Sequence, residues 1–186
     1  MSVKSKMQNQ SMSASRLKLI IVMGVSGCGK SSLGRTLAQD LAYRFIEADD
    51  YHSSEAKAHM AAGKPLTDDM REPWLQRLIS TISAEPRDNT VMAYSGLRRK
   101  HRQRFRELGF DTLFIHLYGE QDLIMHRMRQ RQDHFMPTSL LASQYSALEL
   151  PDAEPDVVTL DIALDLAQIV QQAHAVVRRM PSTPEA

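Results

Sequence analysis

The chain has 186 residues, of which 42% are apolar and 24% charged, and its formal net charge is +1. This composition favours one compact domain over a disordered chain, and the balanced charge lacks the basic footprint of a nucleic-acid-binding protein. The longest apolar run, at 19–23, is too short to cross a bilayer, and a single cysteine favours a reducing compartment. We therefore expect a cytoplasmic protein with no nucleic-acid and no membrane partner.

The two ends of the chain are expected to lie outside the folded domain. Residues 1–16 carry scattered cations among serines and glutamines, without the apolar segment of a secretion signal, which predicts a disordered N-terminal tail. No linker or internal repeat divides the remainder. We predict a single domain at 17–180 and a short C-terminal tail at 181–186.

The elements predicted in chain order alternate between strands and helices. The first half gives a strand at 17–23, a helix along Leu33, Leu37 and Leu41, a strand at 45–46, and a helix at 54–62 that Gly63 and Pro65 end. The second half begins with a helix that has Pro73 in its first turn and carries Trp74, Leu75, Leu78, Ile79 and Ile82. Strands follow at 91–94 and 113–118, with a basic helix between them. The chain then gives helices at 120–131 and 137–150, a strand at 157–160 and a helix at 164–179. This alternation predicts an α/β fold with a parallel sheet between two layers of helices.

A glycine-rich segment joins the first predicted strand to the first predicted helix. Residues 24–31 read G-V-S-G-C-G-K-S and fit the pattern G-x-x-x-x-G-K-S in its required strand–helix context. In such a loop backbone N–H groups surround phosphate oxygens, Lys30 reaches the β- and γ-phosphates, and the Ser31 hydroxyl ligates Mg²⁺. We predict that nine residues bind ATP: Gly24, Val25, Ser26, Gly27, Cys28, Gly29, Lys30, Ser31 and Ser32.

Cys28 lies inside this loop. Nearby N–H groups and Lys30 favour its thiolate, but a small loop residue in place of serine is the preferred interpretation.

The rest of the sequence narrows the class of triphosphate-binding protein. No Asn-Lys-x-Asp element, which would read guanine, is present. Residues 157–161 resemble the strand of a motor or ATPase that ends in acidic residues. They lie so near the C-terminus, however, that a strand at the edge of the sheet is expected there. The short chain therefore favours a small-molecule kinase.

Three further segments carry a resemblance to a known family. They are F-I-E-A-D-D-Y-H at 45–52, G-K-P-L-T-D-D-M-R-E-P-W-L at 63–75 and H-F-M-P-T-S-L-L-A-S-Q-Y-S-A-L-E at 134–149. With the phosphate loop, they make the chain resemble the gluconate kinases of the P-loop kinase superfamily over roughly 17–175. The resemblance implies a three-layer P-loop kinase fold with about five parallel strands, and a mobile lid at about 127–137. It also implies transfer of phosphate from ATP with Mg²⁺ to D-gluconate, giving 6-phospho-D-gluconate, and a homodimer.

The acidic segment after the second strand is implied to hold the catalytic base. Asp49 lies where parallel sheets place their ligand crevice, and it can accept the proton of the attacking hydroxyl. The alternative is an aspartate that caps the following helix, a role open to Asp50 as well. Glu47 stands where the family usually has Asp and is implied to reach Mg²⁺ through water. His52 is implied to bind substrate hydroxyls, with a plain surface histidine as the alternative.

Cationic and polar residues are implied to bind the acid group of the substrate. Arg71 suits a carboxylate because its guanidinium pairs in bidentate fashion, and the alternative is an internal ion pair with Asp68 or Asp69. The segment Y-S-G-L-R at 94–98 resembles the family's S-A-L-K element, which implies that Ser95 and Arg98 face the floor of the crevice. Trp74, at helical spacing with apolar residues, fits the core better than a sugar platform.

The lid is implied to supply residues that contact ATP and the transferred phosphate. Arg127 and Arg131 are four residues apart and share one helix face, with catalysis assigned to Arg131; the alternative is a solvated arginine face. His134 is implied to contact substrate, and Asp133 departs from the family's usual glycine. Arg102 in the basic run at 98–106 matches a family position, while the rest of that run fits a solvated helix face better than a nucleic-acid patch.

Two other functions stay open on the sequence alone. A P-loop kinase for another small sugar acid or for a shikimate-like substrate would share the fold. A nucleotide-binding regulator without transfer activity is the rival of a different class, since Glu47, Ala48 and Asp133 depart from the family pattern.

Overall fold

The computed structural model describes residues 16–84, 87–130, 137 and 139–180. Its centre is a parallel sheet of five strands in the order β2-β3-β1-β4-β5. The strands are β1 (Lys18–Met23), β2 (Arg44–Glu47), β3 (Thr90–Ala93), β4 (Asp111–Tyr118) and β5 (Val157–Asp161). The parallel α/β sheet predicted from alternating strands and helices is confirmed, with each strand within two residues of its predicted place.

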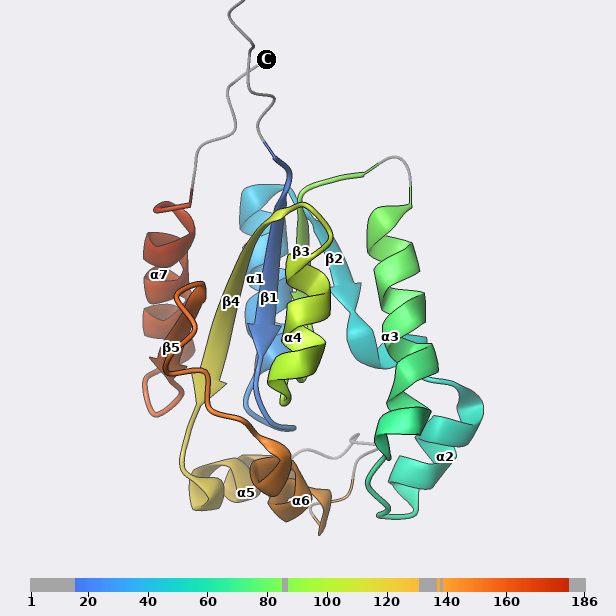
Figure 1. The fold of residues 1–186 in the computed structure, drawn as a ribbon. Coiled ribbons are helices and arrows are strands. Elements are labelled where there is room, and N and C mark those ends of the chain that lie inside the picture. The colour runs from blue at the N-terminus through green and yellow to red at the C-terminus, as the bar shows by residue number, and fades with distance from the viewer. Residues whose placement is uncertain (1–15, 85–86, 131–136, 138, 181–186) are drawn as a thin grey trace, which may run out of the picture.

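Helices cover both faces of this sheet and its lower edge (Figure 1). They are α1 (Lys30–Leu41), α2 (Ser54–Ala61), α3 (Asp68–Ser83), α4 (Arg99–Arg106), α5 (Gln121–Gln130), α6 (Ser139–Ala147) and α7 (Leu166–Val177), with one 3₁₀ turn, η1 (Ala48–Tyr51). Helices α2, α5 and α6 gather beyond the arrowheads, at the carboxyl ends of the strands. In parallel α/β sheets this edge holds the ligand site.

Strand β1 is buried on both faces, as its continuous apolar run predicts. Ile20 and Val22 pack with α1 and α7 in one core, whereas Leu19, Ile21 and Met23 pack with α3 and α4 in the other. Successive side chains of a strand point to opposite faces, so one strand supplies both cores. The three-layer arrangement is therefore confirmed.

Helix α3 begins earlier than the sequence analysis predicts. Its first residue is Asp68, and the Thr67 hydroxyl caps it by accepting a hydrogen bond from the Met70 N–H at 3.3 Å. Pro73 consequently lies inside the helix and not in its first turn. Proline lacks the N–H that would bond the Asp69 carbonyl, a loss that is tolerable because Asp69 is exposed to water. Thr67 was the residue that marked the start of the helix, but Pro73, which also favours a first turn, suggested a later start.

The basic run at 98–106 is a network of ion pairs rather than a simple solvated face. Arg102 is 0% exposed and donates to both carboxylate oxygens of Glu154 and to the Gly96 carbonyl. Burial of a guanidinium requires such a partner, and these hydrogen bonds lower the pKa of Glu154 to about 2. The other cations of the run also pair with carboxylates: Arg98 and Lys100 with Asp68, Arg99 with Glu154, Arg104 with Glu72, and Arg106 with Glu154 and Asp156.

Several predicted features fall outside the described residues. These are the tails at 1–15 and 181–186 and the central part of the predicted lid, with Arg131, Asp133, His134 and Phe135. Strand β5 is confirmed as a peripheral strand, because it pairs with β4 at the edge of the sheet. Within the described part of the chain, no helix has the length and apolar character needed to span a membrane.

Candidate active site

The phosphate-binding loop leaves the carboxyl end of β1 and enters α1 at Lys30. Gly24 has φ 142°, and a Cβ there would lie 2.6 Å from the Leu117 carbonyl oxygen, so only glycine fits. Gly29 has φ 104° and precedes the first turn of α1, whose N-terminus favours anions. The Lys30 ammonium donates to the Val25 carbonyl at 2.8 Å, which holds it against the loop.

Ser31 and Glu47 supply oxygen atoms beside this loop. The Glu47 side chain is 14% exposed and lies 3.6 Å from the Arg35 guanidinium. Burial raises the pKa of Glu47, while a hydrogen bond with the Ser31 hydroxyl opposes the rise. Mg²⁺ takes one or two protein oxygens and completes its shell with phosphates and water. The pair fits that ion, and no cluster of three His, Cys, Asp or Glu side chains suited to a metal occurs among the described residues.

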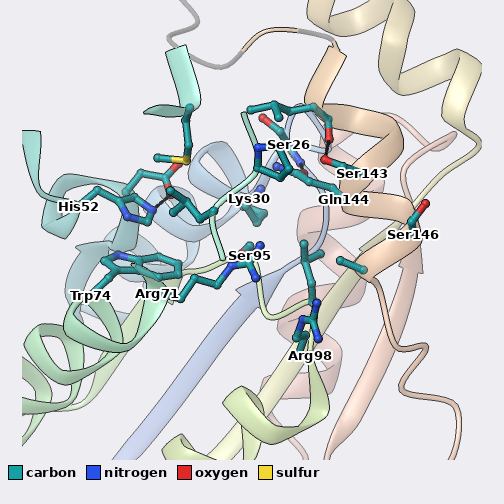
Figure 2. Close-up of a pocket in the computed structure, with 17 residues that line it drawn as sticks. Ser26, Lys30, His52, Arg71, Trp74, Ser95, Arg98, Ser143, Gln144 and Ser146 are labelled. Atoms are coloured by element: carbon teal, nitrogen blue, oxygen red, sulfur yellow. Dashed lines mark hydrogen bonds and ion pairs between the residues drawn. The ribbon is translucent and has the colours of Figure 1, made fainter. Parts of the chain in front are cut away.

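A cavity of about 480 Å³ opens between the phosphate loop and helices α2, α3 and α6 (Figure 2). It brings together seven residues from the predicted site: Ser26, Lys30, Asp49, His52, Arg71, Ser95 and Arg98. They come from four separate segments of the chain, three of which directly follow the carboxyl ends of β1, β2 and β3, while the fourth is the first turn of α3. Their convergence places phosphate-binding, carboxylate and guanidinium groups around one space.

Asp49 lies in η1, directly after β2, and faces the cavity. Its side chain is 37% exposed, and its Oδ1 lies 3.8 Å from the His52 Nε2. The alternative in which Asp49 or Asp50 caps the next helix is wrong, because the Ser53 hydroxyl caps α2 by accepting from the Ala56 N–H at 3.1 Å. Asp49 is therefore left facing the cavity without a capping role.

His52 is a buried residue of the cavity wall, so the alternative of a surface histidine is wrong. Its side chain is 3% exposed and stacks on Trp74, with ring centroids 4.0 Å apart. Trp74 is itself in the core, as predicted, and its indole N–H donates to the Ala48 carbonyl at 2.7 Å. Burial lowers the pKa of His52 to about 4, against the opposing charge of Asp49. His52 is thus neutral near pH 7, and its Nδ1 has no hydrogen-bond partner among the described residues.

Buried histidines make the stability of the fold depend on pH. Burial also lowers the pKa of His116 to about 4, whereas an unfolded histidine titrates near 6.5. Between these values the unfolded chain binds more protons, so stability is lost as the pH falls from 6.5 towards 4. For each histidine this amounts to at most about 3 kcal/mol. Urea denaturation at several pH values measures the free energy of unfolding. We expect this free energy to fall less steeply over the window in His116→Gln than in the wild type. In the control His126→Gln, at an exposed histidine, it should fall as in the wild type.

Arg71 and Arg98 both reach the cavity and share one carboxylate behind it. Asp68 Oδ1 lies 3.2 Å from Arg71 Nη1 and 3.6 Å from Arg98 Nε, and its Oδ2 lies 2.6 Å from the Lys100 ammonium. The hydrogen bond from Lys100 is the main cause that lowers the pKa of Asp68. The ion pair with Asp68 is therefore confirmed, and because Arg71 also lines the cavity, its binding of a substrate carboxylate stays a prediction.

A second cavity, of about 310 Å³, lies on the other side of the phosphate loop. Its wall includes Cys28, Gly29, Ser32, Arg127 and Gln130 beside leucine and isoleucine side chains. Arg127 is partly buried and donates to the Ile162 carbonyl at 2.7 Å, so it is not a solvated arginine. Cys28 is 2% exposed and packs in the core, in agreement with a small structural loop residue.

Sequence reasoning missed the contribution of α6 to the main cavity. Ser143, Gln144 and Ser146 line it, and the Gln144 side-chain oxygen accepts a hydrogen bond from the Ser26 N–H at 2.6 Å. The signal was present in the S-Q-Y stretch of the third family-like segment, but spacing alone did not assign it a partner 118 residues away. Asp68, in the second such segment, was likewise considered only as a possible ion-pair partner of Arg71, and its pairing with Arg98 and Lys100 was missed.

Comparison with known proteins places this arrangement in a family. The family model described as an AAA domain matches residues 19–151. The thermosensitive gluconokinase of Escherichia coli K12 is 38% identical over 84% of this chain and 86% of its own length. A crystal structure of a gluconokinase from Sinorhizobium meliloti 1021 is 40% identical, with a TM-score of 0.80 over 89% of this chain and 94% of that one. A shikimate kinase from Bacteroides thetaiotaomicron, at 18% identity and a TM-score of 0.64, shares only the fold. The chain belongs to the gluconokinase family.

Proposed function

We propose that this protein transfers the γ-phosphoryl group of ATP to the 6-hydroxyl of D-gluconate, giving ADP and 6-phospho-D-gluconate. The observation that carries this proposal is the main cavity, in which Lys30, Asp49 and Arg71 face one space. A phosphate-binding cation, a proton acceptor and a carboxylate-binding cation are the three groups that phosphorylation of a hydroxy acid requires.

The nucleotide is held by the loop and by the second cavity. Backbone N–H groups of the loop from Gly27 to Ser32 and the Lys30 ammonium bind the phosphates, and the partly buried Arg127 lies beside the adenine. Ser31 and, through water, Glu47 would hold Mg²⁺, which neutralises phosphate charge when bound. Lys30 leaves the Val25 carbonyl to reach the β- and γ-phosphates.

The substrate occupies the main cavity with its two ends in different environments. Arg71 and Arg98 bind its carboxylate, while His52 and Ser95 bind hydroxyl groups along the chain. Asp49 orients the 6-hydroxyl and accepts its proton as the oxygen–phosphorus bond forms and the bond to ADP breaks. Arg131 and His134 complete the site from the lid at 127–137.

The same proposal covers the organisation of the protein. Residues 17–180 form one kinase domain, which acts as a cytoplasmic homodimer with Mg²⁺ as its cofactor. Light scattering after size exclusion should give a mass near twice the 21.1 kDa of one chain. A mass of one chain would contradict the dimer and leave the reaction untouched.

A panel of acceptors tests the reaction itself. With ATP and Mg²⁺, coupled detection of ADP should show rapid turnover with gluconate and little with shikimate or with glucose, which lacks the carboxylate. Mass spectrometry should find one phosphate added to gluconate. ADP formation at the same rate without any acceptor, or no ADP formation with any of them, would contradict a kinase and favour a hydrolase or a nucleotide-binding regulator.

Arg71 is expected to determine the preference for an acid. In Arg71→Met the carboxylate loses one charged hydrogen-bonding partner, so the KM for gluconate should rise about 10- to 100-fold while the KM for ATP changes little. Steady-state kinetics with each substrate varied in turn measure both. Arg104→Met, which removes an arginine paired with Glu72 outside the cavity, is the matched control. Equal use of glucose and gluconate by the wild type would refute the carboxylate clamp.

A further inference from the structure

Both polar atoms of one peptide group in the phosphate loop are held by side chains. The carbonyl of Val25 accepts from the Lys30 ammonium at 2.8 Å, and the N–H of Ser26, in the same peptide group, donates to the Gln144 side-chain oxygen at 2.6 Å. The first contact comes from within the loop, whereas the second comes from α6, 118 residues away. Figure 2 shows Gln144 of α6 beside Ser26 of the phosphate loop. The orientation of this peptide therefore depends on a helix outside the loop.

Helix α6 also forms a wall of the main cavity. Leu140, Ser143, Gln144 and Ala147 all line it, and their spacing of three, one and three residues places them on one helical face. The residue that bonds the phosphate loop thus lies among residues that an acceptor in the cavity would touch. One face of α6 contacts both substrate sites.

The far end of α6 is bonded to the loops that follow β3 and β4. The Tyr145 hydroxyl donates to the Gly119 carbonyl at 2.6 Å, and the Glu149 N–H donates to the Leu97 carbonyl at 2.8 Å. Leu141 is fully buried in the core. These attachments hold the helix in place, so Gln144 reaches the Ser26 peptide from a fixed support.

We propose that Gln144 is a positioning residue that couples occupancy of the acceptor cavity to the geometry of the phosphate loop. The inference rests on the proposed function, because gluconate is taken as the occupant of the cavity. When Lys30 turns from the Val25 carbonyl to the nucleotide phosphates, Gln144 keeps the Val25–Ser26 peptide from rotating. An acceptor that packs against α6 strengthens this restraint, and by linkage bound nucleotide strengthens acceptor binding by the same factor.

Calorimetric titration with AMPPNP and Mg²⁺, with and without saturating gluconate, measures the coupling without turnover. We expect gluconate to tighten AMPPNP binding to the wild type by about fivefold or more, the lower end of typical coupling. In Gln144→Leu, which keeps the bulk and removes the acceptor oxygen, this factor should fall to about one, with the gluconate-free Kd for AMPPNP within about twofold of the wild type. Gln103→Leu, at an exposed glutamine that bonds Glu107 one turn along α4, should retain the wild-type factor.

Three results would overturn the inference. They are a wild-type coupling factor near one, an unchanged factor in Gln144→Leu, or an equal loss in Gln103→Leu. If Gln144→Leu does not fold, as judged by circular dichroism, Gln144→Met removes the same oxygen from an unbranched side chain of similar length.

Turnover of gluconate by the wild type is measured on the same preparation. Turnover with unaltered coupling in the variant refutes the role of Gln144 alone, whereas no turnover refutes the proposed function and this inference with it.

Discussion

Replacing Asp49 by asparagine is expected to lower kcat for gluconate by about 10²–10⁴-fold, the usual contribution of a positioned general base. Asparagine keeps the size and the hydrogen-bonding carbonyl of the side chain but cannot take up the proton of the 6-hydroxyl. Asp49 faces the cavity and has no capping role, so the substitution should leave the fold intact. Coupled ADP detection gives kcat, and calorimetry with AMPPNP should give a nearly unchanged Kd.

The neighbouring aspartate provides the control for this prediction. Asp50 lies in the same 3₁₀ turn and is exposed, but it does not line the cavity. Asp50→Asn should therefore keep wild-type kinetics. If Asp49→Asn phosphorylated gluconate normally while binding AMPPNP weakly, Asp49 would belong to the nucleotide site and the base would have to be sought elsewhere.

Lys30→Ala is expected to lower kcat by at least about 10²–10³-fold, as loss of one preorganised charge-stabilising group does elsewhere. The ammonium is the one cation that the phosphate loop itself provides, and the charge it neutralises grows as the γ-phosphoryl group is transferred. In the folded protein it makes a hydrogen bond to the Val25 carbonyl, so its loss should cost only about 1 kcal/mol of stability. Kinetics and thermal unfolding measured on one preparation separate the two effects.

Lys64→Ala is the matched variant, since Lys64 is exposed and does not line the cavity. It should match the wild type in both measurements. A folded Lys30→Ala protein with near wild-type turnover would remove the loop from the reaction. A protein that failed to fold would instead show that the Val25 contact supports the loop more than one hydrogen bond should.

Local sequence patterns were sufficient for the fold and for the phosphate loop. Apolar runs near 17–23 and 113–118 identify central strands because a strand buried on both faces needs continuous apolar side chains. The loop is readable because Gly24, Gly29 and Lys30 meet demands set by neighbouring backbone, within eight residues. The start of α3 was misplaced because two start signals, Thr67 and Pro73, compete within seven residues and only packing decides between them.

The partners of charged and polar side chains depended on the tertiary structure. Arg71 had two interpretations in the sequence, and the folded chain shows that it takes both places, beside Asp68 and at the cavity. Arg102 was set apart from the basic run only by its match to a family position, and the structure shows it buried against Glu154, 52 residues away. Gln144 had no assigned role until α6 was brought to Ser26. Periodicity reports which face of an element is apolar, whereas a hydrogen bond or ion pair between distant segments depends on how whole elements are stacked, which no local pattern encodes.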